Sequence, residues 1–122
     1  METNISSYSP LVLAYAGDAV IELLARERLI LKEESTLAVM NEKCRKYVTA
    51  INQSAASIKG EEFFTEEENA VFRRGKNTKI PNVPRSSTAK DYHRATGLEA
   101  VFGYLYLCGR MERARELFDK IY

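Results

Sequence analysis

Two carboxylates in this sequence each lie among small and apolar residues that are expected to form a helix. Asp18 falls within the stretch LVLAYAGDAVIELL, and Glu99 falls within GLEAVFGYLYL. At 100° per residue, Asp18 shares one helix face with Leu11, Ala14, Tyr15 and Glu22, and Glu99 shares one face with Tyr92, Ala95, Thr96 and Gly103. Burial of an unpaired carboxylate is costly, so each of the two should have a metal ion or an arginine as its partner.

Small residues beside both carboxylates favour the metal. They would let the two helices cross closely and bring Asp18 and Glu99 to one point; they are Ala16, Gly17 and Ala19 on the first helix, and Ala100 and Gly103 on the second. Mg²⁺ prefers oxygen ligands and keeps several waters, so two carboxylates and a substrate phosphate are enough for a site. The pattern alone leaves an ion pair or solvent as the alternative, and Glu22 can pair with Arg26 one turn later.

The elements that would position these residues are helices throughout a single domain, 1–122. No segment alternates with the period of a strand, so the fold class is all-α. The expected helices run from Ser9-Pro10 to about Leu31, from Ser35 or Thr36 toward Lys59 with a division near Thr49, from the Thr65–Glu68 capping box to Gly75, from Ser87 or Thr88 to Cys108, and from Met111 to Tyr122. Two prolines make Lys76–Ser87 a loop.

Charge is unevenly distributed, although the formal net charge is only +1. The segment 73–94 holds seven Lys or Arg against Asp91, a balance of +6, so the rest of the chain carries −5. A basic loop of this kind suits the phosphates of duplex RNA. The predicted RNA-binding residues are Arg73, Arg74, Lys76, Asn77, Lys79, Arg85, Lys90 and Arg94. His93 is expected to be a surface or dimer contact rather than a general base.

Composition indicates an ordinary folded protein of a reducing compartment. Cys44 and Cys108 are far apart and lack the spacing of a zinc site or a disulfide framework. The first nine residues do not resemble a signal peptide, and the apolar stretch from Leu11 to Ala25 is interrupted by Asp18 and Glu22, so no membrane association is expected. We therefore expect a cytoplasmic protein.

Three motifs in this chain resemble the ribonuclease III superfamily. The string YAGDAVIE (15–22) resembles the signature helix of that superfamily, and GLEAVFGYLYL (97–107) resembles its second catalytic helix. The segment RRGKNTK (73–79), the proline-containing loop and YHRATG (92–97), together with FFTEEE (63–68), are similar to the Mini-ribonuclease III branch. The resemblance covers nearly the whole chain and keeps the motifs in order.

The resemblance implies an activity and a set of residues. It implies an all-helical endoribonuclease that forms a homodimer and cuts double-stranded RNA, with the branch acting on a paired stem of the large-subunit (23S) ribosomal RNA precursor. It implies one Mg²⁺-dependent site per subunit, in which Mn²⁺ can substitute. Carried over position by position, the catalytic and metal-binding carboxylates are Asp18 and Glu99.

Two positions depart from the wider superfamily pattern. Ala14 stands where full ribonuclease III enzymes have a Glu, and Thr96 stands where they have an Asp. The resemblance implies that the Mini branch also lacks these two carboxylates. The number of metal ions is therefore left open. Fewer carboxylates mean more waters around an ion, and Thr96 or Glu22 could position one of them.

Two other functions remain open from the sequence. The first is a non-catalytic helical RNA-binding or scaffolding module that keeps the fold without its full set of metal ligands. The second is a helical protein-interaction domain whose basic loop contacts an acidic partner. Turnover of duplex RNA in the presence of Mg²⁺ separates both from the nuclease.

Overall fold

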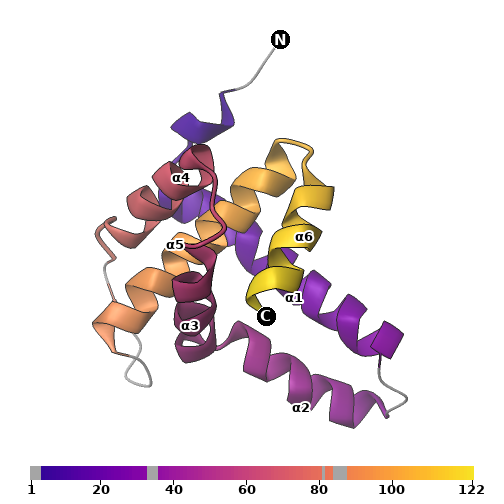
Figure 1. The fold of residues 1–122 in the computed structure, drawn as a ribbon. Coiled ribbons are helices and arrows are strands. Elements are labelled where there is room, and N and C mark those ends of the chain that lie inside the picture. The colour runs from indigo at the N-terminus through magenta and orange to yellow at the C-terminus, as the bar shows by residue number, and fades with distance from the viewer. Residues whose placement is uncertain (1–3, 33–35, 81, 84–87) are drawn as a thin grey trace.

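The computed structural model describes residues 4–32, 36–80, 82–83 and 88–122. Within these ranges the structure has no strand, and the predicted all-α class is confirmed. A short 3₁₀ turn η1 (Ile5–Ser7) precedes the helices (Figure 1), which are α1 (Pro10–Lys32), α2 (Leu37–Val48), α3 (Ala50–Gly60), α4 (Glu66–Lys76), α5 (Ala89–Leu107) and α6 (Met111–Ile121).

Capping side chains set the starts of three helices where the sequence predicted them. The hydroxyl of Thr36 accepts a hydrogen bond from the backbone N–H of Val39 at 3.3 Å. Thr65 and Glu68 form both hydrogen bonds of a capping box, at 3.0 and 3.1 Å, and Thr88 caps α5. Such caps satisfy free amides of the first turn. The alternative caps Ser35 and Ser87 lie outside the described residues.

The predicted basic loop begins slightly later than expected. Lys76 is the last residue of α4, and residues 77–80 and 82–83 are not helical. Arg85, one of the predicted RNA-binding residues, lies outside the described residues. The boundary shift is one residue, which is within the fraying expected of a helix end.

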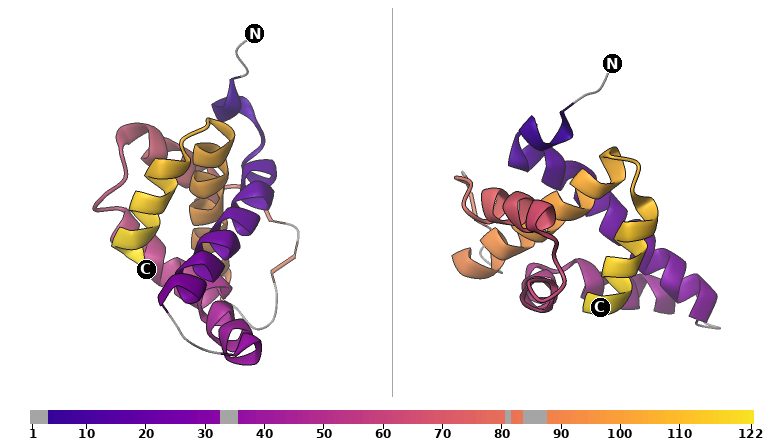
Figure 2. Two further views of the ribbon diagram at one scale, coloured as in Figure 1. Left: turned by 90° about the vertical axis from the view of Figure 1, so that its right-hand side faces the viewer. Right: turned by 45° about the horizontal axis from the view of Figure 1, so that its top comes forward.

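Helix α5 is the centre of the domain, with α1, α3 and α4 packed around it (Figures 1 and 2). Its side chains Leu98, Val101, Phe102 and Leu105 are fully buried. The amphipathic helix α6 adds Leu117, Phe118 and Ile121 to the same core. Among the described residues no helix is long and apolar enough to cross a membrane.

Two glycines bring α1 and α5 into backbone contact. A Cβ built at Gly17 would overlap the carbonyl oxygen of Glu99 and lie 2.8 Å from the backbone N of Gly103. A Cβ built at Gly103 would overlap the carbonyl oxygen of Leu13 and lie 2.9 Å from the backbone N of Gly17. The close crossing predicted from small residues is therefore confirmed, and it depends on these two glycines.

The other small residues serve different purposes. Ala19 is exposed, and Ala100 of α5 faces α4, where a Cβ built at Gly75 would be 3.1 Å from the Cβ of Ala100. At that second crossing, Gly97 of α5 faces Phe72 of α4. Helix α5 is thus held between two neighbours that both approach it through glycine.

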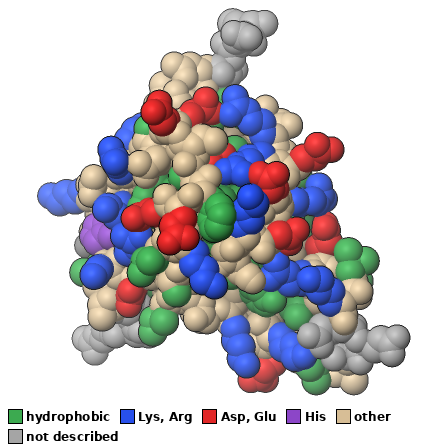
Figure 3. Space-filling view, viewed as in Figure 1, with side chains coloured by type: hydrophobic (Ala, Val, Ile, Leu, Met, Phe, Trp, Pro, Cys, Tyr) green, Lys and Arg blue, Asp and Glu red, His purple; other side chains and the backbone are tan. Residues whose placement is uncertain are grey.

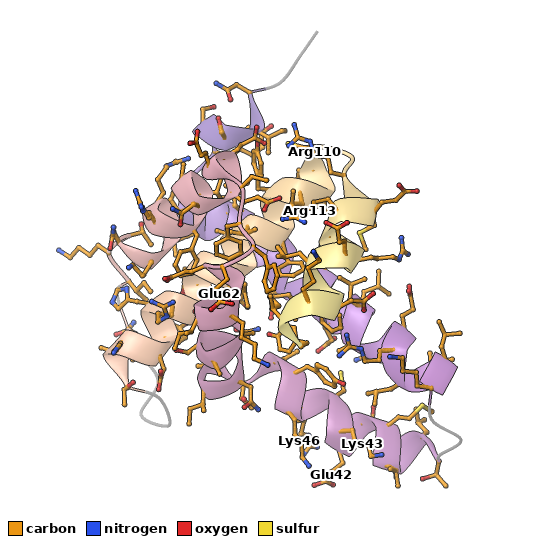
Figure 4. The ribbon with its side chains drawn as sticks, in the orientation of Figure 1. Glu42, Lys43, Lys46, Glu62, Arg110 and Arg113 are labelled. Atoms are coloured by element: carbon orange, nitrogen blue, oxygen red, sulfur yellow. The ribbon has the colours of Figure 1, made fainter. Side chains whose placement is uncertain are left out.

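A buried ion pair fixes α6 to the start of α4. Arg113 (Figure 4) donates to the two carboxylate oxygens of Glu68 at 2.8 and 2.9 Å, and Glu68 is only 2% exposed. Arg113 also donates to the carbonyl oxygen of Phe63 at 2.9 Å. Bidentate geometry and these additional partners satisfy the charges that burial removes from water.

Substitution of Gly103 by alanine should destabilise the protein. In a helix interior, glycine to alanine normally stabilises by up to about 1 kcal/mol. Here the added methyl group overlaps the backbone of α1, so we expect the free energy of unfolding in urea to fall by about 3 kcal/mol or more. Ala55→Ser, on the exposed side of α3, should change it by less than about 0.5 kcal/mol. A Gly103→Ala protein as stable as wild type would contradict the backbone contact.

Candidate active site

Asp18 and Glu99 face each other where α1 crosses α5. Gly17, the neighbour of Asp18, contacts the backbone of Glu99 itself, so the crossing places both carboxyls at one point. Asp18 is exposed and Glu99 is partly buried. The two side chains are close enough to share a hydrogen bond. The sequence-based expectation that they meet is thus consistent with the structure.

No positively charged side chain in the described part of the chain neutralises this pair. Among the described residues, neither carboxylate has an ion pair or hydrogen bond with any Arg or Lys, so the arginine alternative finds no support in the structure. Glu22, one turn further along α1, pairs instead with Arg26 at 3.1 Å.

The surroundings of Glu99 favour its protonated form. Burial, hydrogen bonding to Asp18 and the charge of Asp18 raise the pKa of Glu99 from 4.5 to about 8, and the side-chain amide of Gln53 opposes the rise. The negative charge of Glu99 also contributes to the raised pKa of Tyr122, which is raised mainly by burial. Two carboxylates without a counter-charge form a site that a cation would stabilise.

Gln53 is a site residue that sequence reasoning missed. It lies on α3, is 2% exposed, and has a buried Nε2 with no hydrogen-bond partner in the described part of the chain. The buried face of α3 also includes Ser57 and Gly60, one and two turns later. The sequence signal that could have revealed Gln53 is a single amide side chain on a helix face otherwise made of small residues.

Thr96 has a limited capacity to act on water. It is buried, and its hydroxyl donates to the backbone carbonyl of Tyr92 at 3.0 Å. The hydroxyl oxygen retains lone pairs and can only accept a hydrogen bond while that donation persists. Thr96 could therefore position a water only by accepting a hydrogen bond from it. Glu22, the other residue predicted to position a water, would have to do so while paired with Arg26.

Two of the predicted RNA-binding arginines also have partners within the protein. Arg74 donates to the backbone carbonyls of Ser6 and Tyr8, and so fixes the N-terminal segment to α4. Arg94 donates to Ser57 Oγ at 2.9 Å and pairs with Glu61. Their partners are distant in sequence, so charge counting along the chain could not reveal them.

The other residues predicted to bind RNA remain available to contact a polyanion such as RNA. Arg73, Lys79 and Lys90 are exposed and have no ion pair with described residues. Lys76 Nζ lies 5.8 Å from the ring centroid of Phe72, and Asn77 is the C-cap of α4. On the face shown in Figure 3, basic and acidic side chains are intermixed, so that face carries no continuous basic surface. His93 is partly buried, with a buried Nδ1 that has no described partner.

Glu99 should make the stability of the metal-free protein depend on pH. Between pH 4.5 and about 8 the folded state binds more protons than the unfolded state at this group, so its contribution is complete at low pH and is lost as pH rises. In EDTA, Glu99→Gln should match wild type near pH 5 and be more stable by on the order of 2 kcal/mol near pH 8.5.

Urea denaturation across this pH range measures the difference. Glu62→Gln is the matched control, because Glu62 (Figure 4) is an exposed glutamate between α3 and α4. Its curve should parallel that of wild type. Parallel curves for wild type and Glu99→Gln would contradict the raised pKa of Glu99.

Comparisons with known proteins agree with this geometry. Residues 11–110 match the Ribonuclease III domain family. Mini-ribonuclease 3 of Clostridium tetani is 39% identical, with 97% of this chain and 79% of that protein covered, and Mini-ribonuclease 3 of Staphylococcus aureus is 34% identical, with 98% and 91% covered. A crystal structure of a Fusobacterium nucleatum protein superposes with a TM-score of 0.85 at 33% identity, covering 97% and 94% of the two chains. The chain therefore belongs to the ribonuclease III family, within its Mini-ribonuclease 3 branch.

Proposed function

We propose that this protein is a Mg²⁺-dependent endoribonuclease that hydrolyses double-stranded RNA, with Asp18 and Glu99 as its catalytic residues. The observation that carries the proposal is the pair of facing carboxylates without a positive partner at the α1–α5 crossing. The names of the Mini-ribonuclease 3 relatives support the reaction class.

The donor set fits a hard divalent cation. Asp18 and Glu99 offer carboxylate oxygens, and the described residues contain no cluster of three or more His, Cys, Asp or Glu that would suit a closed zinc site. Ala14 and Thr96 supply no carboxylate, so waters would complete the coordination of Mg²⁺, or of Mn²⁺ in its place.

The chain's own residues divide the work of hydrolysis. Asp18 is exposed, so a phosphodiester can reach it, whereas Glu99 lies deeper against α5. When bound, the metal supplies Lewis-acid polarisation of the phosphate and activates water. Glu99 must be ionised for this work, and the positive charge of the bound metal lowers its raised pKa.

The substrate contacts are to the RNA backbone. Arg73, Lys79 and Lys90 offer exposed positive charges near the loop between α4 and α5, and Lys76 and Asn77 lie at the end of α4 beside them. Contacts of this kind recognise duplex shape and phosphate rather than sequence. We place the activity in the cytoplasm, on a paired stem of the 23S ribosomal RNA precursor; the free thiols of Cys44 and Cys108 suit a reducing compartment.

A homodimer would supply one site for each RNA strand. Helix α1 carries an exposed apolar stripe, repeating at helical spacing, which consists of Val12, Tyr15, Ala19, Leu23 and Ile30. Tyr15 is 85% exposed. Exposed apolar side chains that repeat on one helix face suit an interaction site, and two-fold pairing would make the stripe self-complementary. Asp18 flanks the stripe, so pairing would bring the two sites near one another.

Charge-neutralising substitutions at the site should abolish cleavage. Asp18→Asn and Glu99→Gln should each lower the rate of Mg²⁺-dependent cutting of a base-paired stem by about 100-fold or more, because each removes an anionic ligand. Filter binding in Ca²⁺ should show unchanged affinity for the duplex. Glu62→Gln, at an exposed glutamate between α3 and α4, is the control, and we expect it to retain activity. Binding without turnover by the wild-type protein would favour the non-catalytic module.

A charge in the apolar stripe should produce monomers. Leu23→Asp places a carboxylate at the centre of the stripe and should halve the mass measured by light scattering after size-exclusion chromatography. Ile58→Asp is the matched control, since Ile58 of α3 is exposed to a similar extent, 58% against 54% for Leu23. The dimer assignment fails if wild type is monomeric or if the two variants have the same mass as wild type.

A further inference from the structure

Gln53 occupies a costly position that the fold does not explain. Its side chain is 2% exposed, and its Nε2 is buried without a hydrogen-bond partner in the part of the chain that the structure describes. A buried amide donor that lacks a partner destabilises the fold, whereas an apolar side chain of the same shape would not. A packing role alone therefore does not account for a glutamine here.

The helix that carries Gln53 is fixed against α5 and α2. One turn after Gln53, Ser57 Oγ accepts a hydrogen bond from Arg94 Nε of α5 at 2.9 Å, and donates to the carbonyl of Ser54 at 2.6 Å. On the other side, Asn52 Nδ2 donates to the carbonyl of Lys46 at the end of α2. These contacts leave the Gln53 side chain little freedom to turn away from α5.

The amide of Gln53 faces the catalytic carboxylate. It is close enough to Glu99 to act on that carboxyl as a donor, opposing the effects of burial and of Asp18. The hydrogen bond is nevertheless incomplete, because Nε2 has no partner within bonding geometry. A carboxylate oxygen of Glu99 turned toward α3 would give this buried N–H the acceptor that it lacks.

We propose that Gln53 is a positioning residue of the active site, whose side-chain amide holds the ionised carboxylate of Glu99 in the orientation that metal binding requires. Donors that hydrogen-bond to a ligating carboxylate orient it and raise metal affinity. The assignment rests on the proposed function, since it assumes that Asp18 and Glu99 bind the metal. It gives α3 a part in a site otherwise made by α1 and α5.

The test separates positioning from packing by measuring metal binding directly. Gln53→Met keeps the length of the side chain and removes the donor. It should weaken Mn²⁺ binding, measured by electron paramagnetic resonance, by 10- to 100-fold. The Mg²⁺ concentration for half-maximal cleavage should rise by the same factor, with KM for duplex RNA unchanged. In EDTA its free energy of unfolding should equal or exceed that of wild type, because the unpartnered donor is gone.

Two further variants complete the design. Ser54→Ala, at the next buried position of α3, should leave Mn²⁺ binding unchanged. Gln53→Glu brings a third carboxylate toward Glu99, so it should lower the thermal midpoint in EDTA and gain more stability from Mn²⁺ than wild type does. The Gln53→Glu measurement still tests the proposal if Gln53→Met fails to fold.

The outcomes distinguish this inference from the proposed function. Wild-type Mn²⁺ affinity in Gln53→Met, or no extra Mn²⁺ stabilisation of Gln53→Glu, overturns the role of Gln53 alone, provided that Asp18→Asn abolishes Mn²⁺ binding. If wild type binds no Mn²⁺, or if Asp18→Asn binds it equally well, the metal site itself is wrong and the role of Gln53 falls with it.

Discussion

The backbone contact between α1 and α5 is the constraint on which the rest of this domain depends. Gly17 and Gly103 remove the layer of side chains that normally separates packed helices, so the two backbones meet directly. Because Gly17 precedes Asp18 and touches the backbone of Glu99, the same contact that closes the core also places the two carboxylates together. The separation of the carboxylates thus follows mainly from backbone geometry and less from flexible rotamers.

Placing the two carboxylates together is electrostatically unfavourable, and the packing of the surrounding core keeps them in place. Burial and the neighbouring Asp18 raise the pKa of Glu99 to about 8, which means that its ionised form is unfavourable in the metal-free fold. A second close crossing, where Gly97 meets Phe72 and Gly75, packs α5 against α4 as well. Movement of α5 away from α1 would therefore disturb its packing against α4. A site that is unfavourable without a cation is in turn one that binds a cation more strongly.

Local signals made the helices predictable, whereas distant partners did not appear in the sequence. The Thr65–Glu68 capping box lies within four residues, and the structure contains it as predicted. The same Glu68 also pairs with Arg113, 45 residues away, and that pair was invisible because it depends on how α4 and α6 pack. Arg74 and Arg94 were assigned to RNA for the same reason: their partners lie 33 to 68 residues distant. The carboxylate pair was predictable because small residues near each acid are a local feature, and Gln53 was not, because its proposed role arises only where α3 meets α5.

The intramolecular partners of Arg74 and Arg94 affect how duplex recognition should be viewed. Each phosphate contact contributes through counterion release, so affinity grows with the number of exposed cations that face the duplex. Arg73, Lys79 and Lys90 are few for one protomer, and acidic side chains are intermixed with basic ones on the face in Figure 3. In the proposed dimer, two such sets would engage one duplex, and the second would bind at the high effective concentration set by the first. Pairing through α1 would therefore serve affinity as well as the cutting of two strands, in a chain whose net charge of +1 gives little general attraction to RNA.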